Sequence, residues 1–379
     1  MKTKTWNVGS CLCLCLFLMS CVSPKSDVND LVLVDVTRSL SEKEIYIEDV
    51  AQIKYVRIAS DSDFIYKGGP MAISEDEIVI YDRADGAILF FTIDGKPKSK
   101  FNKRGNGPME YSSPIGMIHD AESDELFVAD MKRIQVYSSD GEYKRTLSFA
   151  EGSSPSQITN CGSSLLFYDR NKAYPSSFVR ISKSTGEVEE SITMPSAAPV
   201  TLFLMEQSEK GVSVIAGPSS NIVKYKSGFL LTDHALDTVY YYQPGRPLSP
   251  ALVRDPAIQS MNPIIYLNSF VEAGGYLFYQ SVEVKGGGTR LPVQYMMIDL
   301  ESGETYLSKI AMKEYKGKYI ELTPLTTLRG STAQIGFIEL SLPELKEADN
   351  EGRLSGQLKQ LVKEMGDEEN NLLLLLNLK

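Results

Sequence analysis

The sequence predicts an all-β fold that is built by repetition. An apolar strand that ends in an aspartate occurs three times, at Ile78–Asp82, Leu126–Asp130 and Leu165–Asp169. A weaker copy, Phe229–Asp233, follows, and Tyr276–Gln280 is a fifth copy without the aspartate. A short loop and another strand come after each copy. A unit that recurs every few dozen residues indicates a repeat architecture.

The clearest copy, from Lys103 to Thr146, predicts a four-stranded unit. It begins with a Gly- and Pro-rich connection at residues 105–108, which is typical of a turn between units. Its last three strands are Leu126–Ala129, Ile134–Tyr137 and Glu142–Phe149. Asp140 and Gly141 join the last two strands, and Gly supplies the positive φ that tight hairpins need. Four antiparallel strands in about 45 residues are typical of a β-propeller blade.

The stretch from Arg104 to Tyr143 resembles an NHL repeat. The chain from Cys21 onward resembles the NHL-like six-bladed β-propeller lipoproteins of gut-dwelling gram-negative bacteria. The residues that carry the resemblance are Gly105, Gly107, Pro108, Glu110, Tyr111, Phe127–Asp130, Arg133–Tyr137, Asp140, Gly141 and the closing strand Asn371–Lys379. The loop after Asp130 is shorter than in the NHL pattern, and later blades keep little beyond the strand rhythm. The resemblance implies a fold and says almost nothing about activity.

The remaining sequence must supply a sixth blade and two insertions. The longest gap between copies contains Pro195–Gly211, where we expect an extra loop. The segments left for the sixth blade are Tyr319–Leu322, Gln334–Leu340, the C-terminal strand and Ile53–Ile58. Joining both ends of the chain in one blade closes the ring and removes open edges. Leu354, Leu358, Leu361, Val362 and Met365 form one helix face, so we expect a short helix inserted in the last blade and packed on the propeller.

The N-terminus predicts export and a lipid anchor. Lys2 and Lys4 precede an apolar run, Cys11–Met19, that is too short to span a bilayer and is typical of a signal peptide. The end of this run and the next two residues, Leu18 to Cys21, resemble a bacterial lipobox, in which the cysteine is acylated. We therefore expect a signal peptide over 1–20, palmitate-type acylation at Cys21, a tether over 21–44 and a single propeller domain over 45–379. The alternative is an ordinary cleaved signal followed by a chance cysteine.

Composition limits the partners and the covalent chemistry. Without Lys2 and Lys4 the chain has 37 basic (39 − 2) and 49 acidic side chains, a net charge of −12 (37 − 49). An acidic chain without a basic tract is a poor nucleic-acid binder, because phosphate neutralisation supplies most of that affinity. Beyond Cys21 the sequence contains one further cysteine, Cys161, so an intramolecular disulfide is not expected.

From the signal peptide and the lipobox-like segment, we expect attachment to a membrane outside the cytoplasm, with the outer membrane favoured.

No metal, cofactor or catalytic residue is predicted. The chain has two histidines, His119 and His234, whereas catalytic zinc usually takes three protein ligands rich in His or Cys. The aspartates that end the repeated strands recur in every clear copy, so we interpret them as turn residues that accept backbone hydrogen bonds. Acidic segments at 61–63 and 120–125 offer oxygen ligands for calcium but lack EF-hand spacing, and solvated turns are the favoured interpretation.

The two faces of the predicted ring differ in charge. The connection face carries the loops between second and third strands and the connections between blades, and the turn face carries the hairpin turns. Turn-face segments such as Glu75–Glu77 and residues 120–125 are strongly acidic, whereas the connection face is nearly neutral with clustered arginine and aromatic residues. Propellers bind ligands where loops of several blades converge at one mouth of the channel. We therefore expect a binding site on the connection face.

The candidate ligand-binding residues lie on that face, and they are Arg83, Arg104, Tyr111, Arg133, Arg170, Tyr174, His234 and Arg290. Arginine offers a planar fork for carboxylates or sulfates, and tyrosine can stack on sugar rings. The alternative is that these arginines pair with neighbouring loop aspartates. The sequence thus predicts a non-catalytic binding or scaffolding propeller of the cell envelope, whose ligand is an oligosaccharide or a partner protein. The alternative function is a propeller enzyme of lactonase or lyase type that acts at the channel mouth.

Overall fold

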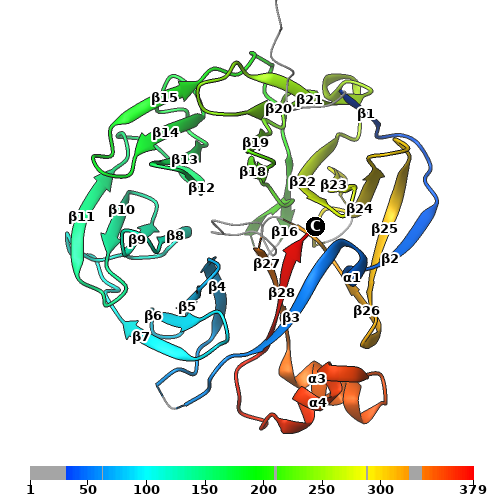
Figure 1. Ribbon diagram of the computed structural model, residues 1–379. Helices are drawn as coiled ribbons and strands as arrows, with labels where there is room; N and C mark the ends of the chain where they lie inside the picture. Colours follow the sequence, from blue (N-terminus) through cyan, green and yellow to red (C-terminus); the bar gives the residue numbers. More distant parts are fainter. Residues whose placement is uncertain (1–30, 62, 209–210, 287–288, 324–334) are drawn as a thin grey trace, which may run out of the picture.

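The chain folds into a ring of small β-sheets. The computed structural model describes residues 31–61, 63–208, 211–286, 289–323 and 335–379. Six sheets are arranged around a central axis, so the predicted six-bladed β-propeller is confirmed (Figure 1). Within the described ranges, every helix is too short or too polar to cross a bilayer.

Blades 1 to 3 are regular, with four antiparallel strands that follow sequence order from the centre outward (Figure 1). Blade 1 consists of β4 (Gly68–Ile73), β5 (Glu77–Asp82), β6 (Ile88–Thr92) and β7 (Pro97–Phe101). Blade 2 consists of β8 (Gly116–Asp120), β9 (Glu125–Ala129), β10 (Arg133–Tyr137) and β11 (Tyr143–Ser148). Blade 3 consists of β12 (Pro155–Cys161), β13 (Ser164–Asp169), β14 (Phe178–Ser182) and β15 (Val188–Ile192). Gly141 has φ of +82°, as the predicted hairpin turn requires.

Blades 4 and 5 add strands to the same unit. Blade 4 consists of β18 (Ile222–Tyr225), β19 (Gly228–Leu231), β20 (Thr238–Tyr242) and β21 (Ser249–Asp255), with β1 (Val32–Asp35) parallel to β21. Blade 5 consists of β22 (Ile265–Ala273), β23 (Tyr276–Glu283), β24 (Val293–Asp299) and β25 (Thr305–Met312). Two more strands pair with β25, and they are β2 (Glu42–Tyr46), which is parallel, and β26 (Tyr315–Ile320), which is antiparallel. A 3-10 turn, η1 (Ile258–Ser260), lies between the two blades.

Two sequence-based boundaries need correction. Strands β1 and β2 lie largely within the range 21–44 that we expected to be a tether, so its described part, from Leu31 on, belongs to the propeller. The reason is an alternation that the tether interpretation overlooked: Val34 is buried against blade 4 while Leu33 points outward. The segment Tyr319–Leu322 was expected in the sixth blade, but its strand β26 pairs with β25, because β25 extends beyond the part that pairs with β24.

Blade 6 joins the two ends of the chain, as predicted. It contains β27 (Ile335–Leu340), β28 (Leu372–Leu378) and β3 (Ala51–Arg57), which follows the short helix α1 (Ile47–Val50). The C-terminal strand β28 lies in the middle and is antiparallel to both β27 and β3. The five leucines from 372 to 376 form a strand that is buried on both faces.

Two helices, rather than the single helix expected, are inserted between β27 and β28. They are α3 (Leu342–Asn350) and α4 (Gly356–Glu364). The predicted face of α4 is buried through Leu358 and Val362. Leu342, Leu345 and Ala348 of α3 join the same hydrophobic cluster, which lies between blades 5 and 6. Both helices therefore pack on the propeller, as the amphipathic pattern indicated.

The core is divided into clusters between neighbouring blades. In β5, Ile78 and Ile80 face blade 6 and Val79 faces blade 2, because successive side chains of a strand point to opposite faces. Blades thus bury both of their faces.

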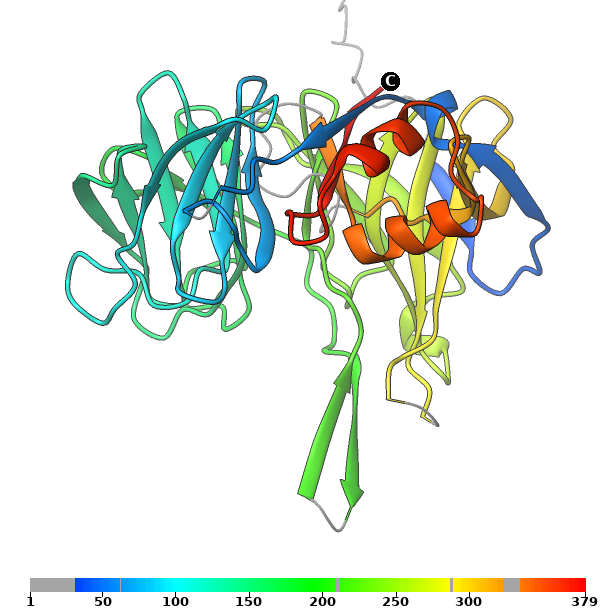
Figure 2. The ribbon, with the colours of Figure 1, turned by 90° about the horizontal axis from the view of Figure 1, so that it is seen from below.

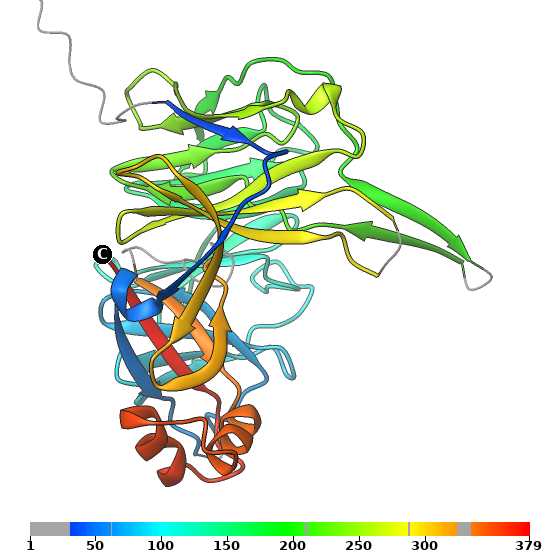
Figure 3. The ribbon, with the colours of Figure 1, turned by 90° about the vertical axis from the view of Figure 1, so that its right-hand side faces the viewer.

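A hairpin projects from the ring between blades 3 and 4, where the sequence predicted an extra loop. Its strands are β16 (Phe203–Ser208) and β17 (Gly211–Ala216), which pair only with each other among the described strands. The hairpin extends from the side opposite the C-terminus (Figures 2 and 3). Its base is held because Ile215 and the partly buried Leu204 pack beside Tyr266 of blade 5.

Candidate functional site

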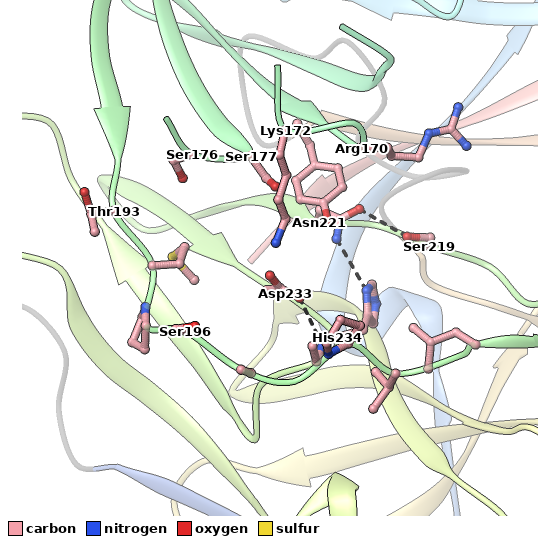
Figure 4. Close-up of a pocket in the computed structure, with 18 of the residues that line it drawn as sticks. Arg170, Lys172, Ser176, Ser177, Thr193, Ser196, Ser219, Asn221, Asp233 and His234 are labelled. Carbon is pink, nitrogen blue, oxygen red and sulfur yellow. Dashed lines mark hydrogen bonds between the residues drawn. The ribbon is translucent and has the colours of Figure 1, made fainter. Parts of the chain in front are cut away.

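A cavity of about 460 Å³ lies on the connection face, between blades 3 and 4 (Figure 4). Four segments form its wall: the β13–β14 loop, the chain after β15, the residues that lead into β18, and the β19–β20 loop. The polar residues labelled in Figure 4 are Arg170, Lys172, Ser176, Ser177, Thr193, Ser196, Ser219, Asn221, Asp233 and His234. Apolar wall is supplied by Pro175, Met194, Pro195, Pro199, Val200 and Leu202. The volume is in the usual range of ligand cavities, ~300–1,000 Å³.

Charged side chains enter the cavity from both blades. Lys172 and Asp233 point into it, whereas the guanidinium of Arg170 points away from the other labelled side chains (Figure 4). Lys172 has φ of +52°, a conformation that L residues other than Asn and Asp rarely adopt. Asp169 holds this loop, because its carboxylate accepts hydrogen bonds from the backbone N–H groups of Asn171 (3.3 Å) and Ala173 (2.7 Å). A fixed loop thus presents the Lys172 ammonium to the cavity.

The floor of the cavity is a buried network of amide and imidazole groups. Asn221 donates to the carbonyl of Thr232 (2.7 Å), and its amide nitrogen lies 3.4 Å from Nδ1 of His234. On the other side of the ring, Nε2 of His234 lies 3.3 Å from Oδ1 of Asn268. Asn268 in turn donates to Oε1 of Gln280 (3.2 Å). The chain of contacts links blade 4 to blade 5 beneath the cavity.

These partners determine the tautomer and the protonation state of the His234 imidazole. The Asn268 oxygen accepts a hydrogen bond, so the imidazole proton resides on Nε2, and Nδ1 accepts from Asn221. Burial lowers the pKa of His234, an effect opposed by the hydrogen bond to Asn268 and by the charge of Asp233. His234 is therefore neutral at physiological pH and positions the amides around it.

Of the eight predicted binding residues, Arg170 and His234 line this cavity. Three others make contacts within the protein. The Tyr111 hydroxyl donates to the carbonyl of Gly86 (2.7 Å), Arg133 donates to the carbonyl of Gly107 (2.6 Å), and the Tyr174 hydroxyl accepts from the N–H of Ala150 (2.7 Å). The remaining three, Arg83, Arg104 and Arg290, are exposed and belong to other blades. The structure does not bring the predicted set together in one place.

Sequence reasoning missed most of the cavity wall. Lys172 and Asn221 were not predicted, and Asp233 was interpreted as a turn residue. One usable signal was present: the long gap between copies, with its prolines at 195 and 199, marked the segment that forms the outer wall. The sequence does not mark Asn221 as a site residue, because a single asparagine before a strand is common.

The repeated aspartates hold backbone turns, as expected. Oδ1 of Asp82 accepts hydrogen bonds from the N–H groups of Lys67 and Ala84, both at 2.9 Å. Asp130 accepts from Lys132 (2.8 Å) and Arg133 (3.0 Å). Among the residues that the structure describes, no group of three or more His, Cys, Asp and Glu side chains is arranged to hold a metal ion.

Comparison with solved structures shows similarity to other propellers. A protein described as exported, from Bacteroides fragilis NCTC 9343, is 15% identical with a TM-score of 0.61, over 92% of this chain and 100% of that one. A member of the duf4221 family from Bacteroides vulgatus is 11% identical with a TM-score of 0.47, over 87% and 99% of the two chains. Virginiamycin B lyase from Staphylococcus aureus is 11% identical with a TM-score of 0.34, over 65% and 88%. At 15% identity, the likeness to the Bacteroides fragilis protein concerns the fold alone.

No curated protein matches this chain. A family model does, and it covers residues 31–377, which is the whole propeller including β1 and nearly all of β28. The chain therefore belongs to the family described as Domain of unknown function (DUF4934).

Proposed function

We propose that this protein is a lipid-anchored propeller of the cell envelope that binds an oligosaccharide in the cavity between blades 3 and 4. The observation that carries the proposal is the wall of that cavity. It combines hydroxyl, amide and charged side chains with proline and aliphatic surface on the connection face. Sugars need both, because their hydroxyls require donors and acceptors and their ring faces require apolar contact. The Lys172 ammonium favours ligands with a carboxylate or sulfate group.

Export and anchoring rest on the sequence of the first 21 residues, which lies outside the described residues. The basic start, the short apolar run and the lipobox-like Leu18–Cys21 support acylation at Cys21. The similarity to a protein described as exported is consistent with a location outside the cytoplasm.

The test is a thermal-shift screen of the chain from residue 22 onward against neutral and acidic oligosaccharides. A ligand at a hundred times its dissociation constant stabilises a protein by about 2.7 kcal/mol, which shifts the transition by degrees. We expect a shift with acidic oligosaccharides that is lost in Lys172→Asn, since Asn removes the charge and tolerates positive φ. Arg104→Ala is the matched control, because Arg104 is an exposed basic residue of the same face outside the cavity. Equal shifts in both variants would refute this site.

A partner protein is the second candidate, and the β16–β17 hairpin favours it. Met205, Val212 and Val214 are 66%, 60% and 61% exposed, and the strand register places them on one face. Exposed apolar patches of this kind mark interaction sites. If a stoichiometric partner purifies with the native protein, Met205→Ser with Val214→Ser should release it, whereas Lys172→Asn should not. Retention of the partner by the double variant would exclude the hairpin as its binding surface.

A further inference from the structure

Exposed leucines gather on the turn face where the chain enters blade 4. Leu31 and Leu33 of the first described segment are 51% and 71% exposed, and Leu300 in the β24–β25 turn is 37% exposed. We call these three residues the leucine patch. They border a cavity of about 710 Å³ between blades 4 and 5, whose inner wall includes Leu230, Leu252, Leu277 and Ile298. The leucine patch thus forms part of the rim of a larger cavity, whose lining combines apolar and charged side chains.

The geometry of β1 explains why its leucines are exposed. Val34 is 1% exposed and packs in the core of blades 4 and 5, so the alternate residue Leu33 points outward. The strand is also the edge of its sheet, with β21 on one side and no described strand on the other. Proteins usually protect such edges with charge, whereas this edge presents leucine. This arrangement indicates a surface that something apolar covers.

The position of the patch in the chain identifies what covers it. Leu31 follows Cys21 by ten residues (31 − 21), which span at most about 35 Å when fully extended. We propose that the leucine patch is the surface through which the anchored propeller contacts the lipid bilayer. The proposal rests on the proposed acylation of Cys21. A tether this short keeps the leucine patch at a high effective concentration near the bilayer. Three leucines are therefore enough to hold the propeller in contact with the membrane surface.

Charge around the patch defines the lipid surface that fits. Glu272, Asp299 and Glu301 border the cavity, against one lysine in its wall, Lys226. Asp299 is paired with Lys43 at 3.2 Å, which leaves two carboxylates facing one ammonium. Anionic headgroups would be repelled at short range, and salt would screen the repulsion. The patch therefore fits a zwitterionic bilayer surface better than an anionic one.

This contact would orient the whole molecule. The leucine patch lies on the turn face, where Lys379 at the C-terminus is also bonded to the β22–β23 turn through Gly274. The β16–β17 hairpin extends from the opposite side (Figure 2). The hairpin and the cavity between blades 3 and 4 would then face away from the membrane, where soluble ligands arrive.

The test uses a single tryptophan as a depth reporter. The chain has one tryptophan, Trp6, which leaves with the predicted signal peptide, so Leu33→Trp would introduce the sole indole of the mature protein. The processed protein is placed in zwitterionic vesicles whose acyl chains carry bromine, which quenches tryptophan on contact. Met131→Trp is the matched control, since Met131 is exposed on the connection face. We expect Leu33→Trp to lose most of its emission and Met131→Trp to keep it.

The experiment distinguishes a failure of the proposed bilayer contact from a failure of the proposed lipid anchor. If mass spectrometry shows an acylated Cys21 but Leu33→Trp is not quenched, or both variants are quenched equally, the leucine patch is not the contact and the anchor stands. If Cys21 carries no lipid, the anchor and the inference both fail. In anionic vesicles we expect quenching of Leu33→Trp to increase with salt; a decrease would show an electrostatic contact and overturn the apolar one.

Discussion

Blades 1 to 3 and blades 4 to 6 are built from the same unit but differ in what is added to it. The first three blades consist of twelve strands, β4 to β15, in uninterrupted order. The last three carry β1, β2 and β26 as outer strands, two helices, and a sixth sheet made from both ends of the chain. The hairpin and the cavity on the connection face lie at the junction of the two halves.

The difference shows where a repeat fold gains specific surfaces. Neighbouring blades in the regular half repeat the same contacts, so a ligand would find little there to distinguish one blade from the next. The cavity between blades 3 and 4 exists because the chain after β15 leaves the repeat before β18 begins. Irregular segments supported by a regular scaffold commonly carry function.

Removal of residues 372–379 should have the largest effect. It deletes β28, whose residues are paired with both β27 and β3, and it opens the ring. The free energy lost with this strand's pairing and burial should exceed the ~5–15 kcal/mol by which a typical domain is stable against unfolding. We expect no cooperative urea transition by circular dichroism. Replacing the hairpin, residues 203–216, by a short Gly-Ser linker is the control and should keep the transition. If the truncated chain still unfolds cooperatively, β28 is not needed to hold the ring closed.

Tyr111→Phe tests the regular half with a smaller expected effect. The buried hydroxyl donates to Gly86 and accepts from the N–H of Lys103 (3.1 Å), so it ties the blade 1–2 connection to the preceding loop. Leaving these groups unpaired should cost about 1–3 kcal/mol in the free energy of unfolding, measured with urea. Tyr143→Phe is matched, because the Tyr143 hydroxyl bonds Thr146 near the surface. Equal losses in the two variants would argue against a special role of the connection.

Acid should weaken the contact between blades 4 and 5 through His234. Burial lowers the pKa of His234 below its ordinary value of 6.5, so the folded state favours neutral imidazole. Its contribution to stability is complete above about pH 6.5 and is lost as the pH falls from there toward the folded pKa, because the unfolded chain binds the proton more readily. We expect His234→Gln to be less sensitive to pH than wild type when urea midpoints at neutral and mildly acidic pH are compared. Burial also lowers the pKa of His119 in blade 2, so His119→Gln shows whether the effect is specific to the contact between blades 4 and 5.

The smallest effect is expected at the hairpin. Met205→Ser combined with Val214→Ser removes apolar atoms that are mostly exposed in the folded protein. Surface substitutions of this kind usually change stability by no more than ~0.5 kcal/mol. Thermal unfolding should therefore be nearly unchanged. A marked destabilisation would mean that the hairpin contributes to the ring.

The repeat predicted the regular half well because its strands are local and similar. Ile78–Asp82 and Leu126–Asp130 indicated strands that the structure confirms as β5 and β9. The strands that leave the repeat were harder to predict. β2 pairs with β25 from about 265 residues away (307 − 42), and nothing in its charged sequence, Glu42–Tyr46, indicates a partner. The helix α3 had a signal that the sequence analysis did not use, since Ser341 precedes it, Pro343 lies in its first turn, and Leu342, Leu345 and Ala348 form a buried face.

The sequence pointed to the face that carries the cavity but not to the residues that line it. The connection face was expected to bind ligands, and the cavity lies there. Its residues come from four segments between 168 and 235, and their meeting depends on how blade 4 is placed after the hairpin. Tyr111 and Arg133 were predicted as binding residues because tyrosine can stack on sugar rings and arginine can bind carboxylates or sulfates. Here the Tyr111 hydroxyl pairs with the carbonyl of Gly86 in the β5–β6 loop, and Arg133 pairs with the carbonyl of Gly107 in the connection between blades 1 and 2.

Closure of the ring by β28 makes folding depend on synthesis that reaches residue 378. β3 begins at Ala51 and its partner strand β28 begins at Leu372, 321 residues later (372 − 51). At ribosomal speeds of roughly 5–20 residues per second, β3 waits about a quarter of a minute to a minute before its neighbour exists. A chain that stops before β28 leaves the facing edges of β3 and β27 unpaired, and unpaired edges of this kind can pair with strands of other chains.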